Sequence, residues 1–308
     1  MSGAYAHLTV INNLVVRPVL KTIDGIENKT INLLLRNSEF CELGALGPDY
    51  PYLVLRQSKV NKWSDLMHFE KTSDFIKTAI EILIEGKSKG KEKNIAWLLG
   101  FCAHVGTDLT IHPIVEKKVG EYEKHQREHR VCEMNQDVYA YHSLNLGGIG
   151  TSEHLDSIVK LFDNGGELET TLVEFWRAIL EANYPSYYKT EFPDINLWHK
   201  WFYNSVDKIA ESGKFVPLSR HITPWCGLTY PEFDCRIDDY ISNLESPEGK
   251  IHYDELFQKA LDNVKVIWAK VIMAIQEKDS KIWDFENFDL GTGLYLENPD
   301  KFVFWSKK

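Results

Sequence analysis

Hydrophobic side chains recur three or four residues apart along most of the chain, as on one face of a helix. One helix is expected within residues 1–35. Residues 290–308, in contrast, have no helical period and are expected to be extended. The pattern favours an all-α fold, a multi-helix bundle. Its clearest amphipathic helices are predicted over residues 64–84, 152–162, 167–182, 195–212 and 253–278.

Residues 94–111 are apolar on nearly all sides, which indicates a helix through the middle of the core. Pro113 disfavours helical geometry at the residue before it and is expected to end this helix. A second long helix, polar on one side, is predicted over residues 115–144. The two predicted helices are separated in the chain by residues 112–114.

Glycines and prolines divide the chain at two places. Residues 42–55 contain two glycines and two prolines, which disfavour a continuous helix and predict a rigid turn around Asp49. The glycine-rich segment 146–150 is the strongest internal boundary. We therefore expect a core of residues 1–150 and a mainly helical C-terminal region of residues 151–308, which can pack into the same domain.

Charge and cysteine usage narrow the class of protein. The formal net charge of −10 argues against a long nucleic acid as partner, because non-specific binding of its backbone is mostly electrostatic. The five cysteines are odd in number, widely spaced and without a C-x-x-C pair, which indicates reduced thiols. The N-terminus has no secretory-signal pattern, and no uninterrupted apolar stretch reaches membrane-spanning length. We expect a cytoplasmic protein without a transmembrane segment.

Three chemistry-bearing residues, His104, Asp108 and His112, lie at steps of four within and just after the apolar segment. On a helix they form one stripe, with neighbours about 6 Å apart. His104 and His112 are then about 12 Å apart at the backbone, too far to share one Zn²⁺ comfortably. A multi-metal cluster in which Asp108 bridges two ions is the natural geometry, and a buried hydrogen-bonded polar network is the alternative.

A second pair, His129 and Glu133, repeats the four-residue step and can close a site with His112. Such a pair is weak evidence alone, because about one or two pairs of this kind are expected by chance in a chain this acidic. The alternative for this pair is a solvated helix face.

Four ordered motifs, taken together, resemble a known family. They are G-A-Y-A-H at residues 3–7, G-P-D-Y-P-Y at 47–52, H-V-G-T-D-L-T-I-H-P at 104–113 and H-R-V-C-E at 129–133. This set resembles the zinc-dependent phospholipase C family, whose fold is shared with fungal zinc-dependent single-strand nucleases. The resemblance covers roughly residues 1–145 and implies an all-helical protein whose cleft holds up to three zinc ions.

The resemblance also implies the zinc ligands and a catalytic residue. Asp49 would orient or deprotonate the attacking water in addition to binding zinc. For His68, the alternative to zinc binding is a side chain that caps a helix or faces solvent. The implied sets are Asp49, His68, His104 and Asp108 on one ion, His7 and Asp108 on its neighbour, and His112, His129 and Glu133 on the third.

The chain departs from the family pattern in two respects. Secreted members begin with a Trp whose amine and carbonyl complete one zinc shell, and this chain has no such Trp. After removal of Met1, the amine of Ser2 can take that place. The gap between Asp108 and His112 is shorter than the family usually shows, so the ion that His112 serves is left open.

The expected function is zinc-dependent hydrolysis of a small phosphate ester or a phospholipid. Three zinc ions with three carboxylate ligands leave a local positive charge that attracts such a substrate. The alternatives are a nuclease or nucleotidase on the same site and a non-catalytic binding protein stabilised by zinc. Aromatic side chains of the C-terminal half can either line the cleft or, the favoured interpretation, pack in the core. They are Trp176, Tyr184, Tyr187, Tyr188, Trp198, Trp201, Phe202 and Trp225.

Overall fold

The computed structural model describes residues 3–54, 57–86, 90–144, 167–212 and 230–306, with side chains described to residue 204 in the fourth segment. Helices dominate these residues, and the regular sheet within them is a single two-stranded antiparallel hairpin of β1 (Leu244–Ser246) and β2 (Gly249–Ile251). The all-α prediction is confirmed. The predicted helix over 152–162 and the domain boundary near residue 150 lie outside the described residues.

The helices follow one another with short connections. The first half of the chain contains α1 (Ala4–Leu14), α2 (Arg17–Leu20), α3 (Asn28–Arg36), α4 (Ser38–Leu46), the 3₁₀ helix η1 (Gly47–Leu53), α5 (Ser58–Phe69), α6 (Thr72–Ile84), α7 (Lys91–Val119) and α8 (Gln126–His142). The second half contains α10 (Thr170–Asn183), α11 (Pro185–Thr190), α12 (Ile195–Ser212), the short 3₁₀ helices η3 (Phe233–Cys235) and η4 (Asp238–Tyr240), α13 (Tyr253–Glu277) and η5 (Ser280–Ile282).

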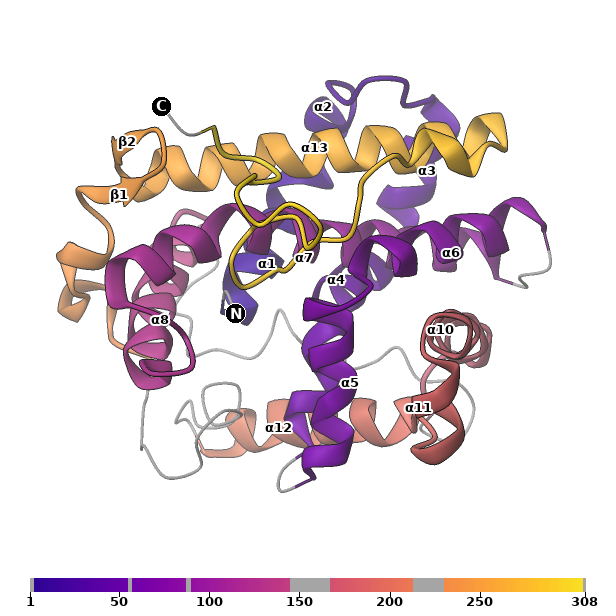
Figure 1. The fold of residues 1–308 in the computed structure, drawn as a ribbon, viewed down its shortest axis with the longest axis horizontal. Coiled ribbons are helices and arrows are strands. Elements are labelled where there is room, and N and C mark those ends of the chain that lie inside the picture. The colour runs from indigo at the N-terminus through magenta and orange to yellow at the C-terminus, as the bar shows by residue number, and fades with distance from the viewer. Residues whose placement is uncertain (1–2, 55–56, 87–89, 145–166, 213–229, 307–308) are drawn as a thin grey trace.

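Helix α7 is the centre of the fold, and every residue from Asn94 to Val115 is buried. α4 and α13 pack along it, and α13 crosses the molecule from the hairpin to the far end (Figure 1). By length and composition α7 is apolar enough to cross a membrane, but its apolar window is wholly buried inside the protein. Burial on all sides makes α7 a core helix, as its sequence predicted, and the expectation of no transmembrane segment stays a prediction.

Two predicted helix boundaries around α7 are wrong. α7 continues through Pro113 to Val119, because the burial of Ile114 and Val115 outweighs a proline penalty of about 3 kcal/mol. The long helix predicted over 115–144 is instead divided at Gly120, whose φ of +98° suits glycine and turns the chain. The segment from Val115 to Val119 therefore belongs to α7, and α8 is a separate helix.

Two other predicted segments are subdivided. Residues 64–84 form the end of α5 and all of α6, with a break at Glu70 and Lys71. The turn predicted over residues 42–55 begins later than expected, since α4 runs through Gly44 to Leu46, and Asp49 lies in the 3₁₀ helix η1. Asp49 is thus held in a short, proline-bearing helix rather than in an irregular loop.

Glycines let α4 and α7 approach backbone to backbone. A Cβ on Gly44 would lie 2.0 Å from the carbonyl oxygen of Trp97, and one on Gly100 would lie 1.9 Å from that of Cys41. Neither contact is possible with a side chain at these positions. This close crossing places the end of α4, and η1 after it, directly beside the middle of α7.

The variant Gly100→Ala is expected to destabilise the protein by about 1–3 kcal/mol or more, because its methyl group would meet a backbone carbonyl that cannot move aside. At an exposed helix position the change from glycine to alanine stabilises a protein by about 1 kcal/mol. The sign of the change in unfolding free energy therefore distinguishes the two environments. Denaturant unfolding measures the effect. Gly106→Ala is the control on the same helix, since its methyl would meet chiefly the side chain of Val264, at 2.8 Å, and should cost less. A Gly100→Ala protein as stable as wild type would contradict this packing.

The aromatic residues of the C-terminal half belong to the core where they are described. Trp176, Trp198 and Phe202 are fully buried and pack in the main hydrophobic cluster. The packing interpretation is confirmed for these three, while Trp225 lies outside the described residues. The described cysteines are all free thiols, as predicted: Cys41, Cys102 and Cys132 are buried, Cys235 is exposed, and Cys226 lies outside the described residues.

Candidate metal centre

Six predicted ligands come together where α1, η1, α5 and α7 meet. α7 contributes three of them along one face, and the close crossing with α4 brings η1 to the same place. His7, His68, His104 and Asp108 are completely buried. Helices separated by long stretches of sequence therefore converge on one polar centre in an apolar interior. The six residues are His7 on α1, Asp49 on η1, His68 on α5, and His104, Asp108 and His112 on α7.

The carboxylate of Asp108 lies among three imidazoles. Its Oδ1 atom is 3.4 Å from Nε2 of His7 and 3.3 Å from Nε2 of His112. Its Oδ2 atom is 3.1 Å from Nε2 of His104. His7 and His104 also stack, with ring centroids 3.9 Å apart. Asp108 thus presents one oxygen to each of two neighbouring positions, as a bridging ligand must.

A second group shares His104 with the first. His68 Nε2 is 3.4 Å from Oδ1 of Asp49 and 3.1 Å from Nε2 of His104. In each of two triplets, His7–His104–Asp108 and Asp49–His68–His104, the potential ligand atoms lie within 4.8 Å of one another. Among the described residues these two triplets are the groups dense enough to hold a metal ion.

The other ring nitrogens of three histidines are fixed by backbone carbonyls. Nδ1 of His68 is 2.7 Å from the Ser64 oxygen, that of His104 is 2.9 Å from the Ala45 oxygen, and that of His112 is 2.8 Å from the Leu290 oxygen. A carbonyl only accepts, so each Nδ1 carries the hydrogen, and in its neutral form each ring turns a lone pair on Nε2 toward the centre. This is the outer support that metal-binding histidines ordinarily have.

The centre lacks hydrogen-bond donors for its acceptors, which is the test of whether a cation fits. In the part of the chain that the structure describes, no hydrogen-bond partner reaches the buried nitrogens of His7, the two oxygens of Asp108, Oδ1 of Asp49 or Nε2 of His112. Lone pairs of imidazoles and carboxylates face one another across distances near 3 Å, which is strongly unfavourable unless a positive charge lies between them. The nitrogen and oxygen donors are those that Zn²⁺ prefers, so the residues fit zinc.

The electrostatics of the centre favour an ionised Asp108 and a neutral His7, the forms in which these two residues bind metal. Burial lowers the pKa of His7 to about 3, so this imidazole is neutral near pH 7. Burial opposes ionisation of Asp108, but the surrounding imidazoles, His112 first, hold its pKa well below the usual range. For His104, the carboxylate of Asp108 outweighs burial and raises the pKa. A cation, whether a proton or a metal ion, is therefore favoured beside Asp108.

The third predicted ligand set, His112, His129 and Glu133, is not among the two dense groups of ligand atoms found in the described residues. His129 and Glu133 are both buried on α8, but Nε2 of His129 is hydrogen-bonded to the Gly120 carbonyl. His129 and His112 line one cavity of about 60 Å³, together with Tyr52, Phe69, Tyr122 and Gly291. The solvated-face alternative is wrong for this pair because both side chains are buried. A third ion held by His112, His129 and Glu133 stays a prediction, and the amine of Ser2 lies outside the described residues.

Asp137 supports the centre and was missed from the sequence. It accepts hydrogen bonds from the backbone N–H of Ala6 and the hydroxyl of Tyr230, both at 2.8 Å. A Cβ on Gly3 would lie 1.8 Å from its carboxylate, so the chain before α1 is pressed against this side chain. Asp137 follows His129 and Glu133 by one more step of four, which is the signal that could have identified it. It fixes the start of α1, and with it His7.

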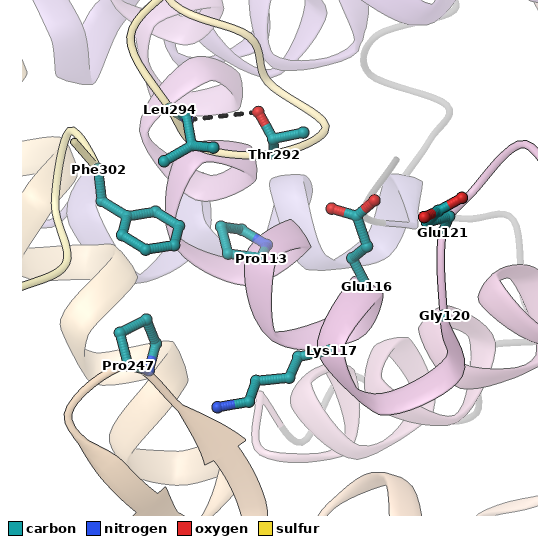
Figure 2. A pocket seen from close by; sticks show the side chains of 9 residues that line it. All are labelled: Pro113, Glu116, Lys117, Gly120, Glu121, Pro247, Thr292, Leu294 and Phe302. Atoms are coloured by element: carbon teal, nitrogen blue, oxygen red, sulfur yellow. Dashed lines mark hydrogen bonds between the residues drawn. The ribbon is translucent and has the colours of Figure 1, made fainter. Parts of the chain in front are cut away.

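A larger groove of about 540 Å³ lies beside the C-terminal end of α7 (Figure 2). Pro113, Glu116 and Lys117 of α7, Pro247 of the hairpin turn, and Leu294 and Phe302 of the C-terminal segment line it. None of the predicted zinc ligands is among its lining residues. The groups that could hold a metal ion therefore lie in the acceptor-rich centre rather than in this groove.

Comparison with known proteins gives one match. A family model described as zinc dependent phospholipase C matches residues 6–186, which include every predicted ligand from His7 to Glu133. No curated protein and no solved structure matches significantly. The match extends beyond the N-terminal motifs into α11.

Proposed function

Because the chain belongs to the zinc-dependent phospholipase C family, we propose that it hydrolyses phosphodiesters of the phospholipid type by means of a metal-activated water. The observation that supports this most is the Asp108 carboxylate, which lies within 3.4 Å of three imidazole nitrogens without a hydrogen-bond donor. Bound zinc lowers the pKa of a coordinated water and neutralises charge on the phosphoryl oxygens. Up to three ions are proposed.

The residues of the centre have different proposed roles, either orienting the attacking water or holding metal. His68 holds Asp49 at 3.4 Å, and although burial opposes it, this contact and the nearby imidazoles keep the pKa of Asp49 well below its usual range. The two triplets contain two carboxylates, those of Asp49 and Asp108. The side chain of Asp49 is 20% exposed and is reached by solvent, whereas Asp108 is completely buried. An ionised, partly accessible carboxylate accepts a hydrogen bond from the attacking water and is therefore suited to orient it. His104 and Asp108, which are inaccessible, are suited only to hold metal.

The surroundings of the centre favour a small substrate. The cavity beside His112 and His129 is walled by Tyr52, Phe69 and Tyr122 and has a volume of about 60 Å³. Aromatic walls suit an apolar or cationic group attached to the phosphate. The acidic net charge of −10 opposes a long polyanion. We therefore place a phospholipid or small phosphodiester ahead of a nucleic acid, and a cytoplasmic location remains a prediction.

The test compares three substrates with zinc-loaded protein: phosphatidylcholine vesicles, bis(p-nitrophenyl) phosphate and single-stranded DNA. Hydrolysis of the first two, with little of the third, is expected. Asp49→Asn should reduce kcat by about 10²–10⁴-fold, whereas Asp74→Asn, an exposed control, should not. Cleavage of DNA alone would favour the nuclease alternative. Full zinc occupancy without hydrolysis of any substrate would favour zinc with a structural role and overturn the proposal.

A further inference from the structure

Arg130 is a buried cation on α8, directly after His129. Only 9% of its surface is exposed, although arginine is almost never buried without partners. The exposed Arg127, one turn earlier on the same helix, shows the ordinary arrangement for α8. Something other than helix amphipathicity therefore keeps Arg130 in the interior.

The acceptors of the described residues do not fully satisfy this guanidinium. Its Nη1 is 3.9 Å from Oε2 of Glu133, which is an ion pair but too long for a hydrogen bond. Its Nε is buried without a hydrogen-bond partner. No described residue accepts a hydrogen bond from any of its nitrogens within the 3.5 Å limit. A guanidinium has five N–H donors, and the buried Nε–H has no acceptor among the described residues, so it is available to an acceptor from a ligand.

The charges around Arg130 connect it to the metal centre. Glu133, 3.9 Å from Arg130, is an implied ligand of the third zinc ion, and His129, another implied ligand of that ion, directly precedes Arg130 on α8. When a zinc ion takes the charge of Glu133, Arg130 faces another cation. An anion with several oxygens between the two cations removes this repulsion.

We propose that Arg130 binds the phosphoryl oxygens of the substrate, beside the site where His112, His129 and Glu133 would hold a zinc ion. The planar fork of a guanidinium matches two oxygens of one phosphate, which a lysine ammonium does not. Arg130 thus selects a tetrahedral oxyanion and neutralises charge that the metal ions leave uncovered. This inference rests on the proposed function and assigns a residue that the zinc-ligand motifs leave without a role.

Binding of inorganic phosphate to the zinc-loaded protein, measured by titration calorimetry, tests the inference without catalysis. Arg130→Gln should weaken phosphate binding by at least about tenfold, and Arg130→Lys by at least about threefold. Arg127→Gln is the matched control and should bind as wild type does. Zinc content, measured on the same samples, should be unchanged in all three variants. For phosphodiester hydrolysis, Arg130→Gln should raise KM by a similar factor.

The outcomes separate this inference from the proposed function. If the wild type hydrolyses phosphodiesters but Arg130→Gln binds phosphate with unchanged affinity, the role of Arg130 is overturned and the function stands. If no substrate is hydrolysed yet phosphate binding depends on Arg130, the function fails and the anion site stands. If both Arg130 variants lose zinc, the residue supports the metal centre rather than the substrate, and the inference is overturned.

Discussion

Replacing Asp108 with asparagine should remove more than one zinc ion from each chain and abolish most phosphodiester hydrolysis. Asp108 contacts His7 and His112 through one oxygen and His104 through the other, so its loss affects both sides of the centre. The amide keeps the size of the side chain but removes the negative charge, and its NH₂ group cannot act as a ligand. Loss of a mere outer-shell partner costs about 10–100-fold in metal affinity or activity, so a bridging ligand should cost more.

Elemental analysis of the purified variant measures the zinc, and hydrolysis of bis(p-nitrophenyl) phosphate measures the activity. Asp74→Asn changes an exposed aspartate on α6 in the same way and should retain zinc and activity. A loss of one ion or none in Asp108→Asn, with activity within about tenfold of wild type, would show that Asp108 does not bridge two ions.

Removing zinc with a chelator should lower the melting temperature by roughly 8–16 °C for each ion that is lost. Each tightly bound ion stabilises the folded state by about 4 kcal/mol when its free concentration is a thousandfold above Kd, and a protein of this size loses about 2–4 °C per kcal/mol. The physical reason lies in the buried acceptors of His7, Asp49, Asp108 and His112, which have no hydrogen-bond donors. Without a cation their mutual repulsion acts against the fold.

Differential scanning calorimetry with and without 1,10-phenanthroline measures this shift. Adding zinc back should restore the melting temperature, whereas magnesium, which prefers oxygen ligands, should not. In Asp108→Asn the chelator should have a much smaller effect, since the variant has less zinc to lose. An unchanged melting temperature in chelated wild type would mean that the polar centre is stable without metal.

The helical periodicity predicted most of the fold because it reports which face of each segment is buried. Helices α12 and α13 end within one residue of their predicted bounds. The errors fell where tertiary contacts decide the outcome: α7 passes through Pro113, and Gly120 divides a segment whose periodicity looked continuous. A sequence pattern records which residues prefer the interior, but it does not show which backbone strain the surrounding packing will tolerate.

The candidate site was predictable in part. The four-residue spacing placed His104, Asp108 and His112 on one stripe, which the structure bears out, because spacing along a single helix is a local property. The convergence of His7, Asp49 and His68 on that stripe depends on how distant helices pack, and only the family resemblance suggested it. Matching the family model confirmed that resemblance.

Residues outside the motifs were missed for a related reason. Asp137 acts by accepting the backbone N–H of Ala6, and Arg130 stands out only because its donors find no acceptor in the interior. Neither property is visible in residue type or spacing. Both depend on burial, which the polar composition of α8 concealed.

The central claim is that a zinc cluster occupies the acceptor-rich centre beside Asp108. Anomalous X-ray scattering at the zinc absorption edge, from crystals of protein purified without chelators, tests it most directly. We predict anomalous peaks on both sides of the Asp108 carboxylate, one beside His7 and one among Asp49, His68 and His104. A map without a peak at either position, at full zinc supply, would contradict the claim.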